Sequence, residues 1–263
     1  MDFRKIFDTI PDEFDKWRPR YCDELFNDVI DHSKLNSNKT ALEIGPGTGQ
    51  ATEPVLKTGC SYLAIELGEN LAAFIKNKFK SYDNLQIINA DFELYDFGRD
   101  RFDLVYSAAA FQWIKEDIGY PKVFDILKSG GTFATFGTGE TPENRKQPVY
   151  AKIQEVYTQY FKPEIEYTCD LKTRNKTPEE SQQIHFDILN KYGFVNIEYR
   201  YYDKTRELTA DEFVSYTKTN ATSITLKEPY KSKFYSGIRE VVLSFDNKIK
   251  IYDRIILYLA RKP

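Results

Sequence analysis

The amino-acid sequence predicts a single α/β domain built around a mostly parallel β-sheet. Short apolar runs alternate with segments of helical periodicity along residues 40–137, and the first apolar run passes into a glycine-rich turn. No internal repeat or low-complexity linker divides the chain. With 263 residues, 41% of them hydrophobic, the chain can bury a full core and fits one elaborated domain better than two independent ones.

The glycine-rich turn follows the first predicted strand. Residues 40–49 read TALEIGPGTG, and an amphipathic segment begins directly after them. Because glycine permits positive φ angles and close backbone approach, Gly45, Gly47 and Gly49 predict a ligand-binding turn above the carboxyl end of the strand. The third glycine comes one residue earlier than in the G-x-G-x-x-G fingerprint of dinucleotide sites, with Gln50 where that fingerprint has Gly or Ala. The spacing therefore disfavours a pyrophosphate ligand.

An acidic residue ends the second apolar run. Glu66 closes the run 61–66, about 20 residues beyond the first glycine, where an acid can accept hydrogen bonds from both hydroxyls of a ribose. Nicotinamide enzymes use an acid at the same place, so Glu66 favours an adenosyl ligand without saying which one. A solvated carboxylate at a strand end is the structural alternative.

Two further strands follow. The third run, 85–92, ends in Ala-Asp-Phe, and the fourth, 101–108, leads into the small residues 107–110. Further strands are predicted at 132–137, 193–199 and 249–261, and helices at 23–32, 50–56, 71–79, 122–128, 177–192, 209–216 and 234–245, with one more within 138–177.

Three motifs resemble those of the class I S-adenosylmethionine (SAM)-dependent methyltransferases. Residues 43–49 resemble the family's E-x-G-x-G-x-G motif, and LKSGG at 127–131 resembles its L-K-P-G-G turn. The segment FDKWRPRY at 14–21 looks like the R-P-x-Y segment of small-molecule methyltransferases of the trans-aconitate type; simple packing of an amino-terminal segment is the alternative. The similarity spans nearly the whole chain and is strongest over 40–137.

The resemblance implies a Rossmann-like sheet of seven strands, mostly parallel with an antiparallel last strand, helices on both faces and helical insertions that form a lid. It divides the single domain 1–263 into an amino-terminal cap (1–39), a SAM-binding core (40–137), a helical insertion (138–177) and a carboxyl-terminal part of the sheet with a second helical insertion (178–263).

The resemblance also implies the site residues. Arg18 would lie near the SAM carboxylate, Tyr21 would form an aromatic wall, and Glu43 would help to anchor the methionine half. Asp91 would accept a hydrogen bond from the adenine amino group. The expected cofactor residues are Arg18, Tyr21, Glu43, Gly45, Gly47, Gly49, Glu66, Leu67, Asp91, Phe92 and Ala108.

The acceptor pocket is expected at Phe111, Gln112 and Trp113, directly after the small residues that would face the sulfonium. The family often has His where this chain has Gln112, which weakens a proton-abstraction mechanism there. A small carboxylic acid, ionised before it binds, is the leading acceptor hypothesis.

Composition narrows the partners. A formal net charge of −3 gives no basic field, which disfavours nucleic acid. The three cysteines show no metal-type pairing and the two histidines lie far apart, so we expect no metal site. The small number of cysteines favours a reducing compartment such as the cytoplasm. No apolar run is long enough for a membrane span. We expect a cytoplasmic monomer or homodimer.

The sequence therefore predicts a SAM-dependent methyltransferase that acts on a small molecule by in-line displacement and releases S-adenosylhomocysteine. A SAM-binding protein without turnover would share every cofactor residue. A nicotinamide-dependent oxidoreductase is a further alternative, opposed by the glycine spacing and by the lack of a hydride-site motif.

Overall fold

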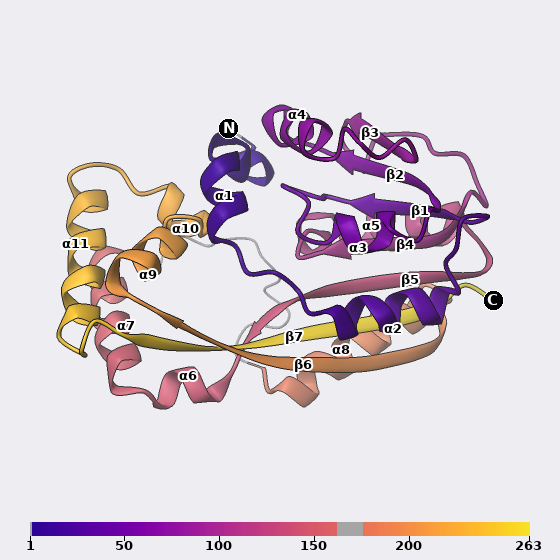
Figure 1. Ribbon diagram of the computed structural model, residues 1–263. Helices are drawn as coiled ribbons and strands as arrows, with labels where there is room; N and C mark the ends of the chain where they lie inside the picture. Colours follow the sequence, from indigo (N-terminus) through magenta and orange to yellow (C-terminus); the bar gives the residue numbers. More distant parts are fainter. Residues whose placement is uncertain (1, 162–175) are drawn as a thin grey trace.

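The computed structural model describes residues 2–161 and 176–263. Within these ranges, seven strands form one sheet in the order β3-β2-β1-β4-β5-β7-β6 (Figure 1). The strands are β1 (Thr40–Ile44), β2 (Ser61–Glu66), β3 (Leu85–Asn89), β4 (Phe102–Ala108), β5 (Leu127–Glu140), β6 (Val195–Leu208) and β7 (Ile249–Arg261).

The strand pairing places several carboxyl ends at one edge of the sheet. The strands β1 to β5 pair in parallel, whereas β7 pairs antiparallel with both β5 and β6. In register, Ile44 lies opposite Ile65 and Glu66 opposite Asn89. The turns after β1, β2 and β3 therefore meet, as is usual for a binding edge in an α/β sheet. The predicted mostly parallel sheet with an antiparallel last strand is confirmed.

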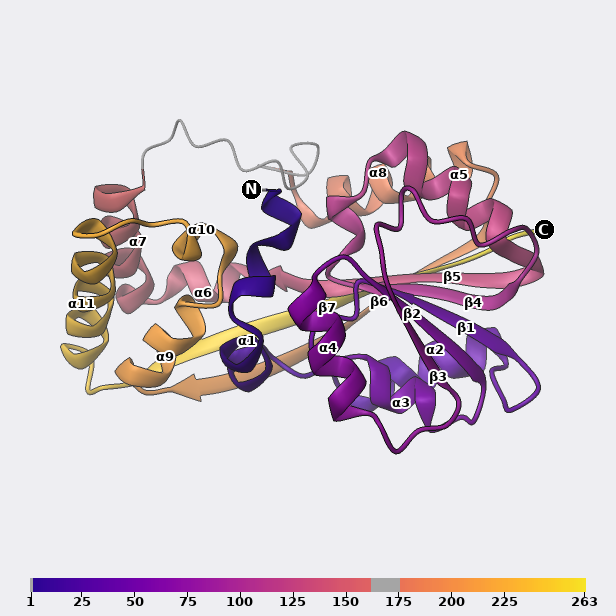
Figure 2. The same cartoon turned by 90° about the horizontal axis from the view of Figure 1, so that it is seen from above.

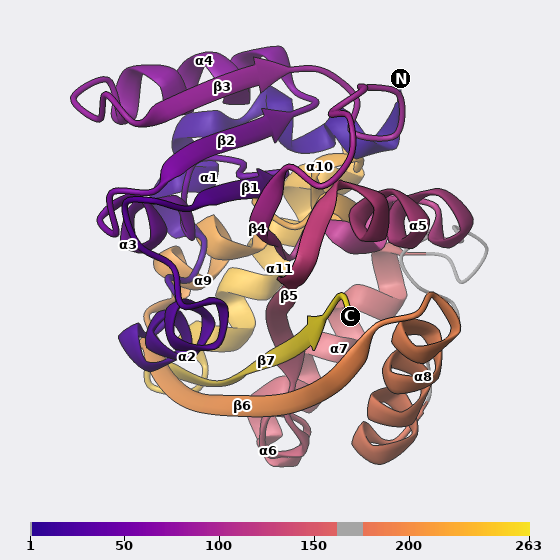
Figure 3. The same cartoon turned by 90° about the vertical axis from the view of Figure 1, so that its right-hand side faces the viewer.

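Helices cover both faces of the sheet, as Figures 2 and 3 show. One buried cluster joins α2, α3 and α4 to alternate residues of β1, β2 and β4; the other joins α5 and α8 to the opposite face. Alternation along each strand sends successive side chains to opposite faces, so both faces need a cover. These helices are α2 (Asp23–Ser33), α3 (Thr52–Leu56), α4 (Glu69–Lys78), α5 (Glu116–Ile126) and α8 (Pro178–Lys191).

A third buried cluster forms a helical lobe beyond the parallel strands, on the left in Figure 1. It packs α7, α9 and α11 against the start of β7. The predicted helical insertion 138–177 supplies α6 and α7, while its residues 162–175 lie outside the described ranges. The lobe contains α6 (Pro142–Lys146), α7 (Pro148–Tyr160), α9 (Ala210–Thr217), α10 (Ala221–Ile224) and α11 (Tyr230–Leu243).

The amino-terminal segment lies between the lobe and the parallel strands (Figure 1). It forms the 3-10 helix η1 (Phe3–Thr9) and the helix α1 (Pro11–Trp17). A second short 3-10 helix, η2 (Phe111–Trp113), follows β4.

Three predicted boundaries are wrong. The predicted helix 122–128 is α5, which begins six residues earlier at Glu116 and contains Pro121. Residues 129–131 were expected to cap that helix, but they lie within β5, which begins at Leu127 opposite Phe102. The strand β6 also runs nine residues past its predicted end at 199, because β7 pairs with it as far as Leu208.

Candidate functional site

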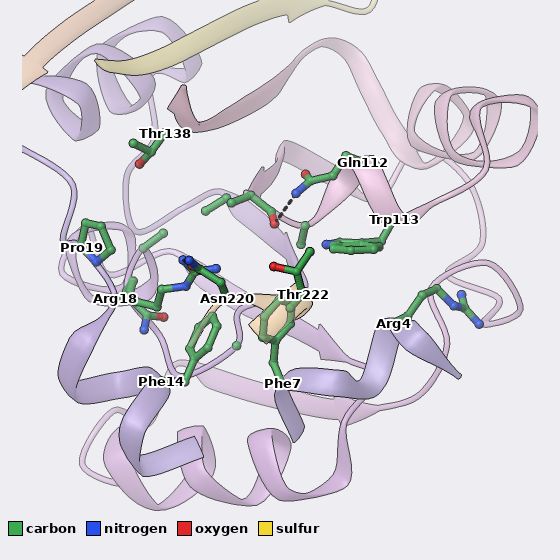
Figure 4. A pocket seen from close by; sticks show the side chains of 18 of the residues that line it. Arg4, Phe7, Phe14, Arg18, Pro19, Gln112, Trp113, Thr138, Asn220 and Thr222 are labelled. Carbon is green, nitrogen blue, oxygen red and sulfur yellow. Dashed lines mark hydrogen bonds between the residues drawn. The ribbon is translucent and has the colours of Figure 1, made fainter. Parts of the chain in front are cut away.

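A cavity of about 970 Å³ lies at the carboxyl ends of the parallel strands. Its wall combines the glycine turn, the ends of β2, β4 and β5, the amino-terminal segment and the helices α7, α9 and α10. Figure 4 shows part of this wall, with Arg4, Phe7 and Phe14 of the amino-terminal segment labelled. The structure brings most of the expected site residues to this wall: Arg18, Tyr21, Gly45, Gly47, Glu66, Leu67, Asp91, Phe92, Ala108, Gln112 and Trp113.

The glycine turn is shaped by close contacts. Gly45 has φ +66°, and a Cβ added to it would lie 2.6 Å from Cβ of Ala110. Gly49 has φ +83°, and its added Cβ would lie 2.4 Å from the Phe79 ring, so this glycine serves the packing of the turn on α4 and does not line the cavity. Gly47 presents its backbone amide to Glu66.

Glu43 lies beneath the turn and away from the cavity wall. Its Oε2 accepts hydrogen bonds from Thr52 Oγ1 at 2.6 Å and from the Tyr62 hydroxyl at 2.5 Å. Burial raises the pKa of the Glu43 carboxyl to about 7. The structure thus places Glu43 in the core, where it links β1 to α3 and β2 and does not line the cavity.

Glu66 is a buried acid with both oxygens engaged. Oε2 accepts from the Gly47 amide at 3.0 Å and Oε1 from the Gly68 amide at 2.9 Å. Burial raises the pKa of Glu66 to about 7 despite these two bonds. Each carboxylate oxygen can accept a further hydrogen bond, so the side chain can still receive a pair of ligand hydroxyls.

Asp91 is covered by the amino-terminal segment. Arg4 Nη2 lies 2.8 Å from Asp91 Oδ2, and the rings of Phe3 and Phe7 lie 5.6 and 6.4 Å from the Trp113 ring, centroid to centroid. The resemblance predicted that a segment near Arg18 covers the site. It gave no signal for Arg4, because the contact joins residues 87 positions apart.

Arg18 is a half-buried cation on the cavity wall. Its Nη1 donates to Asn220 Oδ1 at 3.1 Å, and its guanidinium lies 5.2 Å from the Phe14 ring centroid (Figure 4). Burial lowers the pKa of Arg18, although an arginine stays protonated in proteins. Among the described residues no ion pair within 4 Å joins Arg18 to a carboxylate. A cation withdrawn from solvent on a cavity wall favours an anionic ligand group.

Phe111 packs away from this cavity. Its ring centroid lies 5.0 Å from those of Tyr120 and Phe133, on the opposite face of the sheet. Gln112 stays at the cavity wall, where its Nε2 donates to the Ala109 carbonyl at 2.9 Å. Of the three residues expected to form the acceptor pocket, Gln112 and Trp113 thus line this cavity and Phe111 does not.

Sequence reasoning missed the side chains that the helical lobe adds to the wall. Tyr157, Thr217, Asn220 and Thr222 come from α7, the end of α9 and α10. No single motif contains them, and only the packing of these helices brings them together.

The sheet order, the glycine turn and the acids after β2 and β3 define a class I SAM-dependent methyltransferase. Residues 23–160, just over half of the chain, match the family model described as ribosomal RNA adenine dimethylase. The chain belongs to that family, whose cofactor is SAM.

Curated relatives with different acceptors are similar to parts of this chain. It is 32% identical over 150 residues to a malonyl-[acyl-carrier protein] O-methyltransferase of a Paenibacillus species, 52% of either chain. It is 34% identical over 73 residues to ribosomal RNA small subunit methyltransferase A of Clostridium acetobutylicum, 28% of this chain and 26% of the relative. Such matches span 64% or less of the relatives' own length.

A solved structure shows the same fold. Phosphoethanolamine N-methyltransferase 2 of Haemonchus contortus, in complex with SAM, aligns with a TM-score of 0.58 at 18% identity over 99% of this chain and 60% of its own. Across residues 2–161 and 176–263, no helix is long and apolar enough to cross a bilayer, and no three His, Cys, Asp or Glu side chains gather as metal ligands.

Proposed function

We propose that this chain transfers a methyl group from SAM to a small-molecule acceptor, a carboxylic acid being the leading candidate. One observation carries the proposal. The residues suited to an adenosyl ligand line one part of the cavity, and the helical lobe lines the rest of the same cavity. Ligand cavities usually measure about 300–1,000 Å³, so one of about 970 Å³ can hold a cofactor together with a second small molecule.

The cofactor residues follow from the donors and acceptors on the wall. Glu66 would accept the ribose hydroxyls, Asp91 the adenine amino group, and Arg18 would pair with the carboxylate of the methionine part. SAM supplies a positively charged sulfur from which the methyl group leaves readily. The task of the protein is therefore to position the acceptor and to exclude water.

The surroundings of Gln112 favour an acceptor that is already ionised. Neither histidine lines this cavity: His32 lies beside Thr132, and His185 stacks on Tyr258 in a neighbouring cavity that Gln112 also borders. An ordinary carboxylate needs no base at neutral pH, only orientation by donors such as the second N–H of Gln112. A phenol or alcohol would need a base to remove its proton, and no histidine on the wall of this cavity can serve as that base.

Adenine in RNA is the second candidate acceptor, because the matching family model is described as ribosomal RNA adenine dimethylase. Two observations favour the small molecule. The amino-terminal segment covers the cavity next to Trp113, and the formal net charge is −3, so the chain as a whole does not attract a polyanion.

Methyl-labelled SAM distinguishes the candidates. The full chain is incubated with panels of short carboxylic acids, phenols and amines, and separately with ribosomal RNA, and labelled products are identified by mass spectrometry. Transfer to a small acid, lost in Arg18→Ala and retained in the surface variant Glu155→Ala, is the expected result. Transfer to RNA alone would overturn the small-molecule proposal, and SAM binding without transfer to any acceptor would indicate a protein that sequesters SAM.

A further inference from the structure

The helical lobe contributes a cluster of neutral polar side chains to the cavity. Thr217, at the end of α9, is 1% exposed, and its Oγ1 makes no hydrogen bond with any described residue although Thr217 lines the cavity. Burying a hydroxyl without a partner is unfavourable. Such a group on a cavity wall is suited to a ligand that supplies the missing bond.

Two neighbours extend this cluster. Tyr157 and Asn220 line the cavity together with Thr217, and burial raises the pKa of Tyr157 to about 12, so the phenol is neutral at physiological pH. Asn220 accepts from Arg18 through Oδ1, which leaves its amide N–H groups as donors (Figure 4). The polar cluster Tyr157, Thr217 and Asn220 thus offers hydroxyl and amide groups and no charge.

The other charges in this part of the wall are already compensated. Asp253 lines the cavity, and Arg206 binds it through Nε at 2.5 Å and Nη2 at 3.1 Å. Arg18 has no carboxylate partner among the described residues, but the proposed function assigns it to the cofactor carboxylate. A carboxylate placed at the polar cluster would therefore be buried without a cation of its own, which is costly.

The wall between these groups is aromatic. Phe213 and Tyr216 from α9 line it together with Phe161 after α7. Aromatic walls bind apolar surface and flat groups. This part of the cavity therefore suits a molecule with an apolar middle part.

We infer that the acceptor carries an uncharged hydrogen-bonding group, such as a hydroxyl, carbonyl or amide, at the end away from its methyl-accepting atom, and that Tyr157, Thr217 and Asn220 receive this group. The inference rests on the proposed function and narrows its substrate class. It excludes polycarboxylates as the preferred acceptors, in contrast with the trans-aconitate resemblance of the sequence.

Direct binding tests the inference without requiring turnover. Three series of straight-chain acids with four to eight carbons, unsubstituted, ω-hydroxy and α,ω-dicarboxylate, are titrated calorimetrically into the full chain saturated with S-adenosylhomocysteine. The ω-hydroxy acid of the best length should bind tightest. Thr217→Val removes the hydroxyl at nearly constant volume and should weaken that acid about three- to tenfold while leaving the unsubstituted acid within about twofold, as expected for one neutral hydrogen bond.

Tyr157→Phe is the second variant, and Glu155→Ala on the exposed face of the same helix is the matched control. S-adenosylhomocysteine affinity should stay unchanged in Thr217→Val and Tyr157→Phe, which shows that both variants fold. Tightest binding of a dicarboxylate, an equal loss for all three series in the variants, or no binding of any ω-hydroxy acid would each overturn the inference. The proposed function fails by a different result: an acid that binds but receives no methyl group from SAM.

Discussion

Replacing Glu43 by Gln should remove a pH dependence from the folding stability of this protein. The Glu43 side chain is fully buried beneath the glycine turn, accepts from Thr52 and Tyr62 through Oε2, and leaves Oε1 without a hydrogen bond to any described residue. Burial raises its pKa from 4.5 to about 7. The folded chain therefore holds the Glu43 proton more tightly than the unfolded chain does.

The sign and size follow from linkage. Below pH 4.5 the carboxyl is protonated in both states, and its contribution to stability is fully present. Between pH 4.5 and about 7 unfolding releases the proton, so this contribution is lost as pH rises. A shift of about 2.5 pKa units corresponds to on the order of 3 kcal/mol, which lowers the midpoint of thermal unfolding by several degrees across that window.

Urea unfolding of the wild type, Glu43→Gln and the surface control Glu155→Gln at several pH values from 5 to 7.5 tests this reasoning. The wild type and the control should lose unfolding free energy as pH rises, whereas Glu43→Gln should lose markedly less. Part of the dependence should persist in Glu43→Gln, because the pKa of Glu66 is raised to about 7 as well. Identical slopes in all three proteins would show that Glu43 ionises in the folded state as readily as in the unfolded chain.

Three further predictions concern the cavity. Calorimetry should show that Glu66→Ala weakens S-adenosylhomocysteine binding by on the order of 1.5–3 kcal/mol per lost charge-assisted hydrogen bond, and that Glu66→Gln weakens it less. Unchanged affinity in Glu66→Ala would show that Glu66 does not bind the ligand. Residues 2–21 should gain hydrogen-exchange protection when S-adenosylhomocysteine binds, because this segment covers the cavity; equal protection with and without the ligand would make it static packing. With a carboxylate acceptor, the methyl-transfer rate of the saturated enzyme should stay nearly constant from about pH 6 to 8. A rise in the logarithm of that rate with pH at a slope near one, abolished by replacing one titratable residue, would instead reveal a general base.

The fold was largely predictable where local pattern and tertiary structure agree. The alternation over Ile249–Arg261 predicted β7 at its observed bounds, and the Thr209 capping box predicted the start of α9. The early start of β5 at Leu127 was not predictable, because a glycine-rich run can end a helix or pass into a strand, and the choice depends on pairing with Phe102.

Some residues of the candidate site could likewise be predicted from the sequence, and others could not. Gly47, Glu66 and Asp91 could be found from sequence because each lies at or near the end of a strand, in a motif of fixed spacing. The burial of Glu43 could not be read locally, since Tyr62 and Tyr106, which enclose it, come from two other strands. The polar cluster Tyr157, Thr217 and Asn220 likewise arises only from the packing of three helices.

The cavity at the strand ends should bind SAM and not a dinucleotide. Calorimetric titration of the full chain with S-adenosylhomocysteine and, separately, with NAD tests this prediction most directly. One molecule of S-adenosylhomocysteine should bind per chain, with affinity reduced in Arg18→Ala, and NAD should give no heat of binding. Saturable binding of NAD, with S-adenosylhomocysteine unbound, would contradict this prediction.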